Sequence, residues 1–535
     1  MRRIPSIIWV FLLLFALVNC AKRGSPTGGP EDETPPQLVG AEPALYATGF
    51  NDKRIRIQFD EYVKLKELQK QLIVSPPLDQ GAYTVTPQGG ASKHIDIKIL
   101  DTLQENTTYT FNFGQSIVDN NEDNPYEYFK YVFSTGDYID SLSVRGLIKD
   151  GLNKFPDQFI SVMLYKVDST YTDSIIYKQK PTYLTNTLDS LTSFDISNVA
   201  EGKYLLVAIK DEGSNYTFDQ DQDKIGFKKQ FIDVPSDSLY ELVMFKENID
   251  FKFGRPSHGA RNKITFGYLG DPSGMEVELL TPQPEGFRSV LLKDPEKDSL
   301  NYWFTPFEAD SLQFKVRKGD EAEDYTVKLR KLAPDSLSIS PSSTNASIHV
   351  KLFLLANTPL TTTDQSKMSL IDNDSVSIDF ETALDQKKNH VDIRFEPKPG
   401  KRYQLKLFPN AVKDMYGETN DTLSFVFSAK ELSELGNLQL ELSNVNFYPI
   451  IIQITDQEGE VIREQYAKEE KPRYFFDGMK PGKYFIRVID DANENGKWDT
   501  GRFLEKTQPE IVRYHPTLID LRANWELNEQ FKLKD

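Results

Sequence analysis

The chain has 535 residues, too many for a single hydrophobic core, and a domain size near 150 residues predicts about three to five domains. Its 80 acidic and 63 basic residues give a net charge of −17, which repels phosphate backbones and argues against nucleic acid as a partner. The single cysteine, Cys20, excludes both a disulfide framework and a thiolate metal cluster.

The first twenty residues are typical of an export signal. Two arginines precede an apolar run at residues 7–18, which is short for a bilayer span but fits a signal-peptide core. The run ends in Leu-Val-Asn-Cys, which resembles the lipobox of bacterial lipoproteins, although Asn19 departs from the usual small residue. The resemblance implies cleavage of residues 1–19 and acylation of Cys20, for example with palmitate. An ordinary signal peptide or an uncleaved anchor is the alternative.

The lipobox resemblance also implies a place in the cell. Acyl chains on Cys20 would hold the protein on a membrane, and we expect the outer membrane, with the periplasmic or surface face left open. Residues 20–36 are poor in apolar side chains and rich in Pro, Gly and acidic residues, which predicts a flexible tether. Membrane lipid is therefore the expected partner, beside envelope proteins or glycans.

Short stretches of alternating polar and apolar residues dominate the rest of the chain. This period of two is typical of strands with one buried and one solvated face, so we expect an all-β, multidomain fold. One short stretch, Tyr62–Leu72, reads as a helix. The clearest strand patterns are Arg54–Phe59, His94–Ile99, Thr108–Phe113, Val391–Phe395 and Tyr403–Leu407.

The chain contains internal repeats. Residues 202–211 (GKYLLVAIKD) align without a gap with residues 482–491 (GKYFIRVIDD), and the offset of 280 continues to Asp219 and Asp499. A weaker repeat relates residues 106–136 to residues 400–429, in which Tyr-to-Phe spacings of 24 recur. These repeats predict that two kinds of domain each occur twice.

The repeated motifs resemble known β-sandwich families. Pro35–Gly136, with Ile57-Gln58-Phe59-Asp60-Glu61, the strand at Tyr109, the turn at Asp119 and the closing Phe133-Ser134-Thr135-Gly136, resembles the bacterial Ig-like domain of surface-layer and lipoprotein chains. The Gly-Lys-Tyr units resemble prealbumin-like or carboxypeptidase-regulatory-like sandwiches. The implied order is an Ig-like domain (37–137), a prealbumin-like sandwich (138–252), a β-rich domain of unknown type (253–332), a divergent Ig-like domain (333–430) and a second prealbumin-like sandwich (431–535).

One loop has the residue pattern of a calcium site. Oxygen-bearing side chains occupy positions 1, 3, 5 and 9 of the loop that begins at residue 491, with glycine at position 6, as at the start of an EF-hand loop. Arg502 stands where the bidentate glutamate belongs, so Glu505 or Asp490 would have to complete the shell. A hairpin loop whose polar side chains bind their own backbone is the alternative. The predicted ligands of a structural calcium are Asp491, Asn493, Asn495, the Lys497 carbonyl and Asp499.

Two weaker patterns suggest further sites. The sister loop keeps Asp211, Asn215 and Asp219, and is a poorer calcium candidate because glycine is missing at position 6. Asp followed by Ser or Thr and a small or apolar residue recurs, which resembles the O-glycosylation sequon of gliding and gut-dwelling Gram-negative bacteria; turn formation explains it equally well. The acceptors would be Thr102, Ser141, Ser238, Ser299, Ser311 and Ser336.

Catalytic motifs are missing from the sequence. No two of the five histidines are close, and no zinc-binding His-Glu-x-x-His, Gly-x-Ser-x-Gly or Walker motif occurs. We therefore expect no enzyme but an envelope lipoprotein that acts as a structural, adhesion or scaffold element. The alternatives are a glycan- or peptide-binding lipoprotein accessory to an outer-membrane transporter, and an enzyme whose site the sequence hides.

Overall fold

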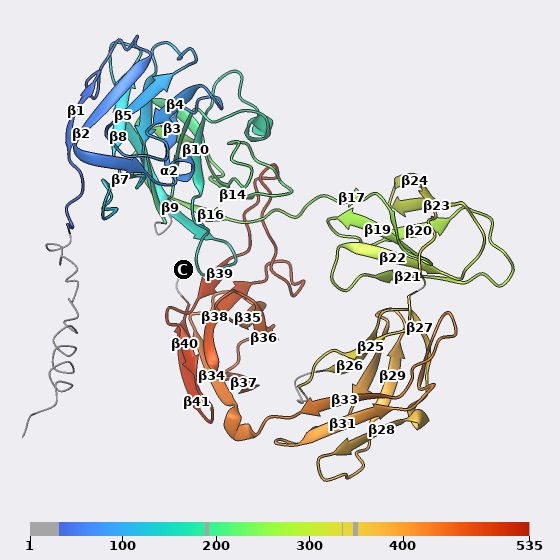
Figure 1. Cartoon of the computed structure of the whole chain (residues 1–535). Coiled ribbons are helices and arrows are strands. Elements are labelled where there is room, and N and C mark those ends of the chain that lie inside the picture. Colours follow the sequence, from blue (N-terminus) through green and yellow to red (C-terminus); the bar gives the residue numbers. More distant parts are fainter. Residues whose placement is uncertain (1–31, 188–191, 334, 346–350, 534–535) are drawn as a thin grey trace, which may run out of the picture.

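The computed structural model describes residues 32–187, 192–333, 335–345 and 351–533, and its regular secondary structure is almost entirely β-strand. Cys20 and the predicted signal peptide lie outside these residues. The strands gather into five β-sandwich modules, which we number 1 to 5 along the chain and which follow one another in a string (Figure 1). The all-β, multidomain fold class is thus confirmed. No helix among the described residues is long and apolar enough to cross a membrane.

Module 1 (residues 37–137) packs two antiparallel sheets face to face. One has the order β1-β2-β5-β4, with β7 also on β2, and the other has the order β3-β6-β8. The elements are β1 (Leu38–Glu42), β2 (Arg54–Leu65), α2 (Leu68–Gln71), β3 (Ile73–Ser75), β4 (Tyr83–Thr86), β5 (Ser92–Ile99), β6 (Thr108–Asn112), β7 (Ile117–Asp119) and β8 (Lys130–Ser134).

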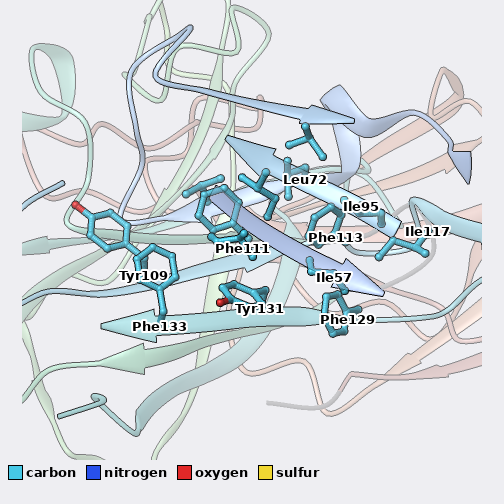
Figure 2. Packing of buried hydrophobic residues seen from close by; sticks show 14 of the residues in the cluster. Ile57, Leu72, Ile95, Tyr109, Phe111, Phe113, Ile117, Phe129, Tyr131 and Phe133 are labelled. Carbon is cyan, nitrogen blue, oxygen red and sulfur yellow. The ribbon is translucent and has the colours of Figure 1, made fainter. Parts of the chain in front are cut away.

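Aromatic side chains fill the space between these sheets. The ring of Phe133 on β8 stacks with those of Tyr109 and Phe111 on β6, with ring centroids 5.5 and 6.3 Å away (Figure 2). They face aliphatic residues such as Ile57 and Ile95 of the other sheet, and all five side chains are at most 1% exposed. Burial of one such side chain contributes about 1.5–3 kcal/mol, so this core fixes the sandwich.

The predicted helix at Tyr62–Leu72 is wrong for most of its length. Residues 62–65 continue β2, where Val63 is fully buried and pairs with Asp119 of β7, and only α2 is helical. Local periodicity favoured the helix, but pairing with a distant strand and burial of Val63 stabilise the extended form.

Modules 2 and 5 share one topology, which confirms the repeat. In each, a four-strand sheet with one added short strand faces a three-strand sheet that contains one parallel pair. The repeated Gly-Lys-Tyr strands, β13 and β38, lie at the same place in both. Module 2 (138–252) contains β9 (Leu142–Asp150), β10 (Ser161–Lys166), η1 (Asp173–Tyr177), β11 (Tyr183–Asn186), β12 (Ser193–Val199), β13 (Gly202–Lys210), β14 (Lys224–Phe227), β15 (Ile232–Val234) and β16 (Leu239–Met244). Module 5 (431–535) contains η3 (Leu432–Glu434), β34 (Gly436–Ser443), β35 (Ile450–Thr455), β36 (Val461–Ala467), β37 (Tyr474–Met479), β38 (Gly482–Asp490), β39 (Val512–Tyr514), β40 (Ile519–Leu521) and β41 (Glu526–Lys532).

Modules 3 and 4 are also sandwiches. Module 3 (253–332) pairs a sheet of order β17-β19-β22-β21, with β18 on β19, with one of order β20-β23-β24. Module 4 (333–430) pairs β25-β26-β30-β29 with β28-β31-β33, beside the short pair β27-β32. The elements are β17 (Lys252–Phe253), β18 (Ser257–Ala260), β19 (Lys263–Leu269), β20 (Met275–Leu279), β21 (Ser289–Lys293), β22 (Ser299–Phe304), β23 (Ser311–Lys318), β24 (Glu321–Lys328), β25 (Ile339–Pro341), β26 (Leu352–Ala356), β27 (Leu360–Thr363), η2 (Gln365–Lys367), β28 (Met368–Asp372), β29 (Glu381–Asp385), β30 (His390–Arg394), β31 (Arg402–Leu407), β32 (Val412–Asp414) and β33 (Leu423–Ser428).

The string of modules closes on itself. Modules 1 and 2 lie side by side, and the Leu184 backbone N–H donates to Ser75 Oγ at 3.1 Å across their boundary. Modules 3 and 4 meet at a small buried cluster that includes Trp303 and Met415. Module 5 (red in Figure 1) then reaches back to module 2 (teal and green). Two modules far apart in the sequence are therefore in direct contact.

Candidate functional site

The loop with the calcium-like pattern joins β38 to β39 in module 5, and we call residues 491–511 the docking loop. Its first half curls around a buried carboxylate: Asp491 is fully buried, and its two oxygens accept the backbone N–H groups of Asn495 at 3.1 Å and Gly496 at 2.8 Å. Gly496 has a φ of 72°, a left-handed conformation that glycine adopts at little cost. The curl predicted from glycine at position 6 is therefore present.

The predicted ligands are brought together, but they bind one another. The side-chain amide nitrogens of Asn493 and Asn495 donate to Asp499 Oδ2 at 2.6 and 2.7 Å. Asn495 Oδ1 in turn accepts the Lys497 backbone N–H at 2.7 Å. Among the described residues, no group of three or more His, Cys, Asp or Glu side chains is arranged to hold a metal ion. The hairpin-loop alternative accounts for every one of these contacts, and calcium remains a prediction.

A carboxylate that the sequence pattern did not single out completes the loop. Glu510 accepts the Ala492 backbone N–H at 2.6 Å and the Asp499 backbone N–H at 3.0 Å, and so ties the two ends of the curl together. Asp490 and Glu505, the two residues expected from the sequence to complete a calcium shell, form ion pairs instead: Asp490 with Arg513 and Glu505 with Arg502.

The sister loop in module 2 repeats this hydrogen-bond pattern. Asp211 accepts the backbone N–H groups of Asn215 and Tyr216, at 3.2 and 2.7 Å, just as Asp491 does in module 5. Asp223 is the structural equivalent of Glu510, because it accepts the backbone N–H groups of Glu212 at 3.0 Å and Asp219 at 2.8 Å. Because Glu510 lies at a different spacing from Asp491 than Asp223 does from Asp211, the sequence carried no signal for it, and only the shared hydrogen bonds show the equivalence.

Burial sets the protonation behaviour of these two bridging carboxylates. Desolvation raises the pKa of Glu510, and the neighbouring Asp499 and Asp491 act in the same direction. Desolvation likewise raises the pKa of Asp223, with Asp211 and Asp219 adding to it. In both loops the backbone N–H groups oppose the shift, because they stabilise the ionised form.

The second half of the docking loop has no counterpart in module 2. The sister loop spans residues 211–223, so the docking loop is eight residues longer, and the extra length reaches module 2. Phe503 at its tip is fully buried in a hydrophobic cluster of module 2, with its ring 5.1 Å from that of Phe227. Trp498 packs at the border of the same cluster.

Polar contacts surround the Phe503 anchor. Thr500 Oγ1 donates to the Lys246 carbonyl at 2.6 Å, and Gln508 Nε2 donates to the Phe227 carbonyl at 3.0 Å. The Phe503 backbone N–H donates to the carboxylate of Glu247, which is 4% exposed. Desolvation raises the pKa of Glu247, while the Phe503 N–H opposes the shift. The interface thus joins an apolar anchor to a buried acid.

A second contact between modules 2 and 5 lies beside the loop. Tyr514 Oη donates to the Leu152 carbonyl at 2.8 Å, and Arg487 Nη1 donates to the same oxygen at 3.1 Å. Arg487 is 3% exposed and also donates to Gln453 Oε1 at 2.6 Å. Both hydrogen bonds are partly shielded from solvent, and they add to the contact that the docking loop makes between modules 2 and 5.

The predicted glycosylation acceptors differ in accessibility. Thr102, Ser141, Ser238 and Ser336 are exposed, and Ser311 is half-buried at the start of β23. Ser299 is 4% exposed and lies in the central strand β22, between β19 and β21. A glycan does not fit at Ser299 in the folded module, whereas the other five positions can be reached from solvent.

Comparison with known proteins agrees with the fold of module 1. Residues 32–135 match the family described as bacterial Ig-like domain. No curated protein matches the chain. Solved structures that align with it include surface layer protein SbsC, domains 1–6 (10% identity, 92% of this chain and 68% of that chain, TM-score 0.16), Salmonella alpha-2-macroglobulin reacted with methylamine (10%, 90% and 42%, 0.15) and the BSP domain of a biofilm associated protein (7%, 88% and 97%, 0.14). TM-scores of this size describe no common arrangement of modules, and nothing about function follows from them.

Module 1 is therefore an Ig-like β-sandwich that matches the bacterial Ig-like domain family, and further β-sandwich modules follow it along the chain.

Proposed function

We propose that this protein is a non-enzymatic, lipid-anchored component of the bacterial cell envelope that serves as a structural, adhesion or scaffold element. The observation that carries the proposal is the closed string of five sandwiches, in which the docking loop of module 5 is buried in module 2. The buried Phe503 ring and the hydrogen bonds around it hold that closure together, and a multi-module body held in this way suits a spacer or scaffold.

The site-like residues also support a structural role. Four carboxylates each accept two backbone N–H groups and so fix the shape of the docking loop and its sister loop: those of Asp491, Glu510, Asp211 and Asp223. Asp119 in module 1 does the same with four backbone N–H groups at 2.7–3.1 Å. Acids used in this way are ordered by the backbone rather than presented to a substrate.

Anchoring follows from the first residues of the chain. Acylation of Cys20 would attach the protein to the outer membrane through the tether at residues 20–36, next to module 1. Glycans on Thr102, Ser141, Ser238, Ser311 and Ser336 would decorate modules 1 to 4. Envelope proteins or glycans would then be the partners of the exposed faces.

Mass spectrometry of the protein purified from its native membrane tests this proposal. We expect acyl mass on an N-terminal Cys20 and hexose-rich mass on peptides that carry the five accessible sites, with none on Ser299. A Cys20→Ser variant should leave the membrane fraction. An unacylated chain cut at another position, or a Cys20→Ser variant that stays membrane-bound, would overturn the lipid-anchor proposal.

A further inference from the structure

The edge of one sheet in module 5 is open. Among the described residues, β36 has β35 as its one strand partner, at the end of a sheet ordered β36-β35-β38-β39. An edge strand presents a row of backbone N–H and C=O groups that another strand can pair with.

The same edge is covered in the sister module. There β11 occupies the place of β36, and module 1 lies against it, so that Leu184 is 2% exposed and its N–H reaches Ser75. At the beginning of β36, by contrast, Val461 and Ile462 are 44% and 36% exposed. The repeat therefore shows that this edge can be buried against another chain segment, and that in module 5 it is not.

A groove of about 650 Å³ lies at the exposed beginning of β36, between modules 4 and 5. This volume is within the range of about 300–1,000 Å³ that is typical of ligand sites. Its walls include Pro397 and Pro399 of module 4, and Leu432, Val461 and Tyr484 of module 5. Leu432 is 69% exposed, so apolar surface is available to an occupant.

Positive charge surrounds the groove. Lys430, Arg463 and Lys480 line it together with a single acid, Asp477. None of these three cations forms an ion pair with another residue in the part of the chain that the structure describes. An excess of unpaired cations stands out in a chain of net charge −17, and it favours an anionic occupant.

From these observations we propose that β36 and its groove bind an acidic, extended peptide segment of a partner protein. The segment adds as a strand along β36, its apolar side chains enter the groove, and its carboxylates lie against Lys430, Arg463 and Lys480. The Ile462 carbonyl of β36 accepts a hydrogen bond from Arg463 Nη1 at 2.9 Å, and a strand would have to displace it there. A peptide backbone complements the N–H and C=O groups of an edge strand, which favours a peptide over an anionic glycan or lipid.

Fluorescence anisotropy with three labelled eight-residue peptides tests the proposal on the full chain in detergent micelles. The probes alternate Glu with Val, Lys with Val, and Glu with Pro. We expect saturable binding of the Glu-Val peptide alone, because Lys reverses the charge and Pro removes every second backbone donor. The variant Lys430→Glu/Lys480→Glu should weaken that binding by at least about tenfold, from two reversed charges. A control with the same change of charge, Lys98→Glu/Lys293→Glu, alters exposed lysines of modules 1 and 3 and should bind as the wild type does.

Three outcomes would overturn the proposal. Equal binding of the Glu-Pro peptide would exclude strand addition, and equal binding of the Lys-Val peptide would exclude charge recognition. No saturable Glu-Val binding below about 1 mM, where the binding free energy falls to about 4 kcal/mol, would exclude the site. Binding is measured on protein whose acylation state can be determined separately, so this proposal and that of a lipid anchor can fail independently.

Discussion

Replacing Phe503 with alanine should open the contact between modules 2 and 5. The ring is fully buried, lies 5.1 Å from Phe227 with the ring planes at 88°, and is covered on one face by Lys506 Nζ at 4.0 Å. A buried Phe-to-Ala change costs about 3–5 kcal/mol. The ring belongs to module 5, whereas the residues packed around it belong mostly to module 2, so this cost falls mainly on the closed state of the junction.

The lower limit of that cost defines the measurement. About 3 kcal/mol corresponds to an increase of more than a hundredfold in the open population. The Phe503 N–H is protected by Glu247 only while the loop is docked, so its hydrogen exchange reports the opening directly. We expect exchange across residues 500–510 to accelerate by that factor in Phe503→Ala, while the core strands of module 1 exchange as before.

The neighbouring residue provides a matched control. Leu504 is in the same loop but is 59% exposed, so Leu504→Ala should change exchange by no more than the roughly 0.5 kcal/mol typical of surface positions. If Phe503→Ala exchanges no faster than Leu504→Ala, the loop is not held by its apolar anchor. The reasoning that closes the string of modules through Phe503 would then be wrong.

Four further changes test other parts of the structure. Asp119→Ala should lower the free energy of unfolding of module 1, measured in urea at neutral pH, by about 1–3 kcal/mol. Desolvation acts to raise the pKa of Asp119, but its four backbone N–H donors lower the pKa overall. The stabilisation by this carboxylate should therefore be lost only as the pH falls through that lowered pKa. Burial raises the pKa of Glu247 above 4.5, so the closed state of the junction binds the proton more tightly than the open state. Docking of the loop should therefore strengthen as the pH falls through the raised pKa and weaken as the pH rises. Glu247→Gln should remove this pH dependence from the hydrogen exchange of the docking loop. Gly146→Ala places a β-carbon 2.1 Å from a carbonyl oxygen of β16, and this overpacking, worth about 1–3 kcal/mol, should lower the melting temperature of module 2. Gly267→Ala is the control, because no atom lies within 4 Å of its new β-carbon, and it should leave the melting temperature unchanged. If the docking loop holds calcium, about 1 mM of the ion should raise the melting temperature of the wild type and leave Asp499→Asn unchanged, and identical melting in calcium and in chelator would exclude the site.

Short-range patterns in the sequence were sufficient for the strands and for the repeats. Residues 54–59 alternate because β2 has one face on the core, and burial follows the alternation residue by residue. The offset of 280 identified β13 and β38 as equivalent strands because each requires the same glycine turn, buried tyrosine and Asp-rich loop. The curl around Asp491 was predictable for the same reason, since its contacts lie within six residues.

Contacts between distant segments could not be read from the sequence. Glu510 replaces Asp223 at a different spacing, so only the common hydrogen bonds show that the two are equivalent. Phe503 reads as an ordinary loop residue until module 2 supplies the cluster that buries it. Likewise, β11 and β36 are both edge strands by pattern, and the position of module 1 alone decides that one is covered and the other open. The individual modules could be predicted because alternation and turns are local features of the chain. How the modules close, and which edge stays exposed, could not, because both depend on surfaces that meet only after each module has folded.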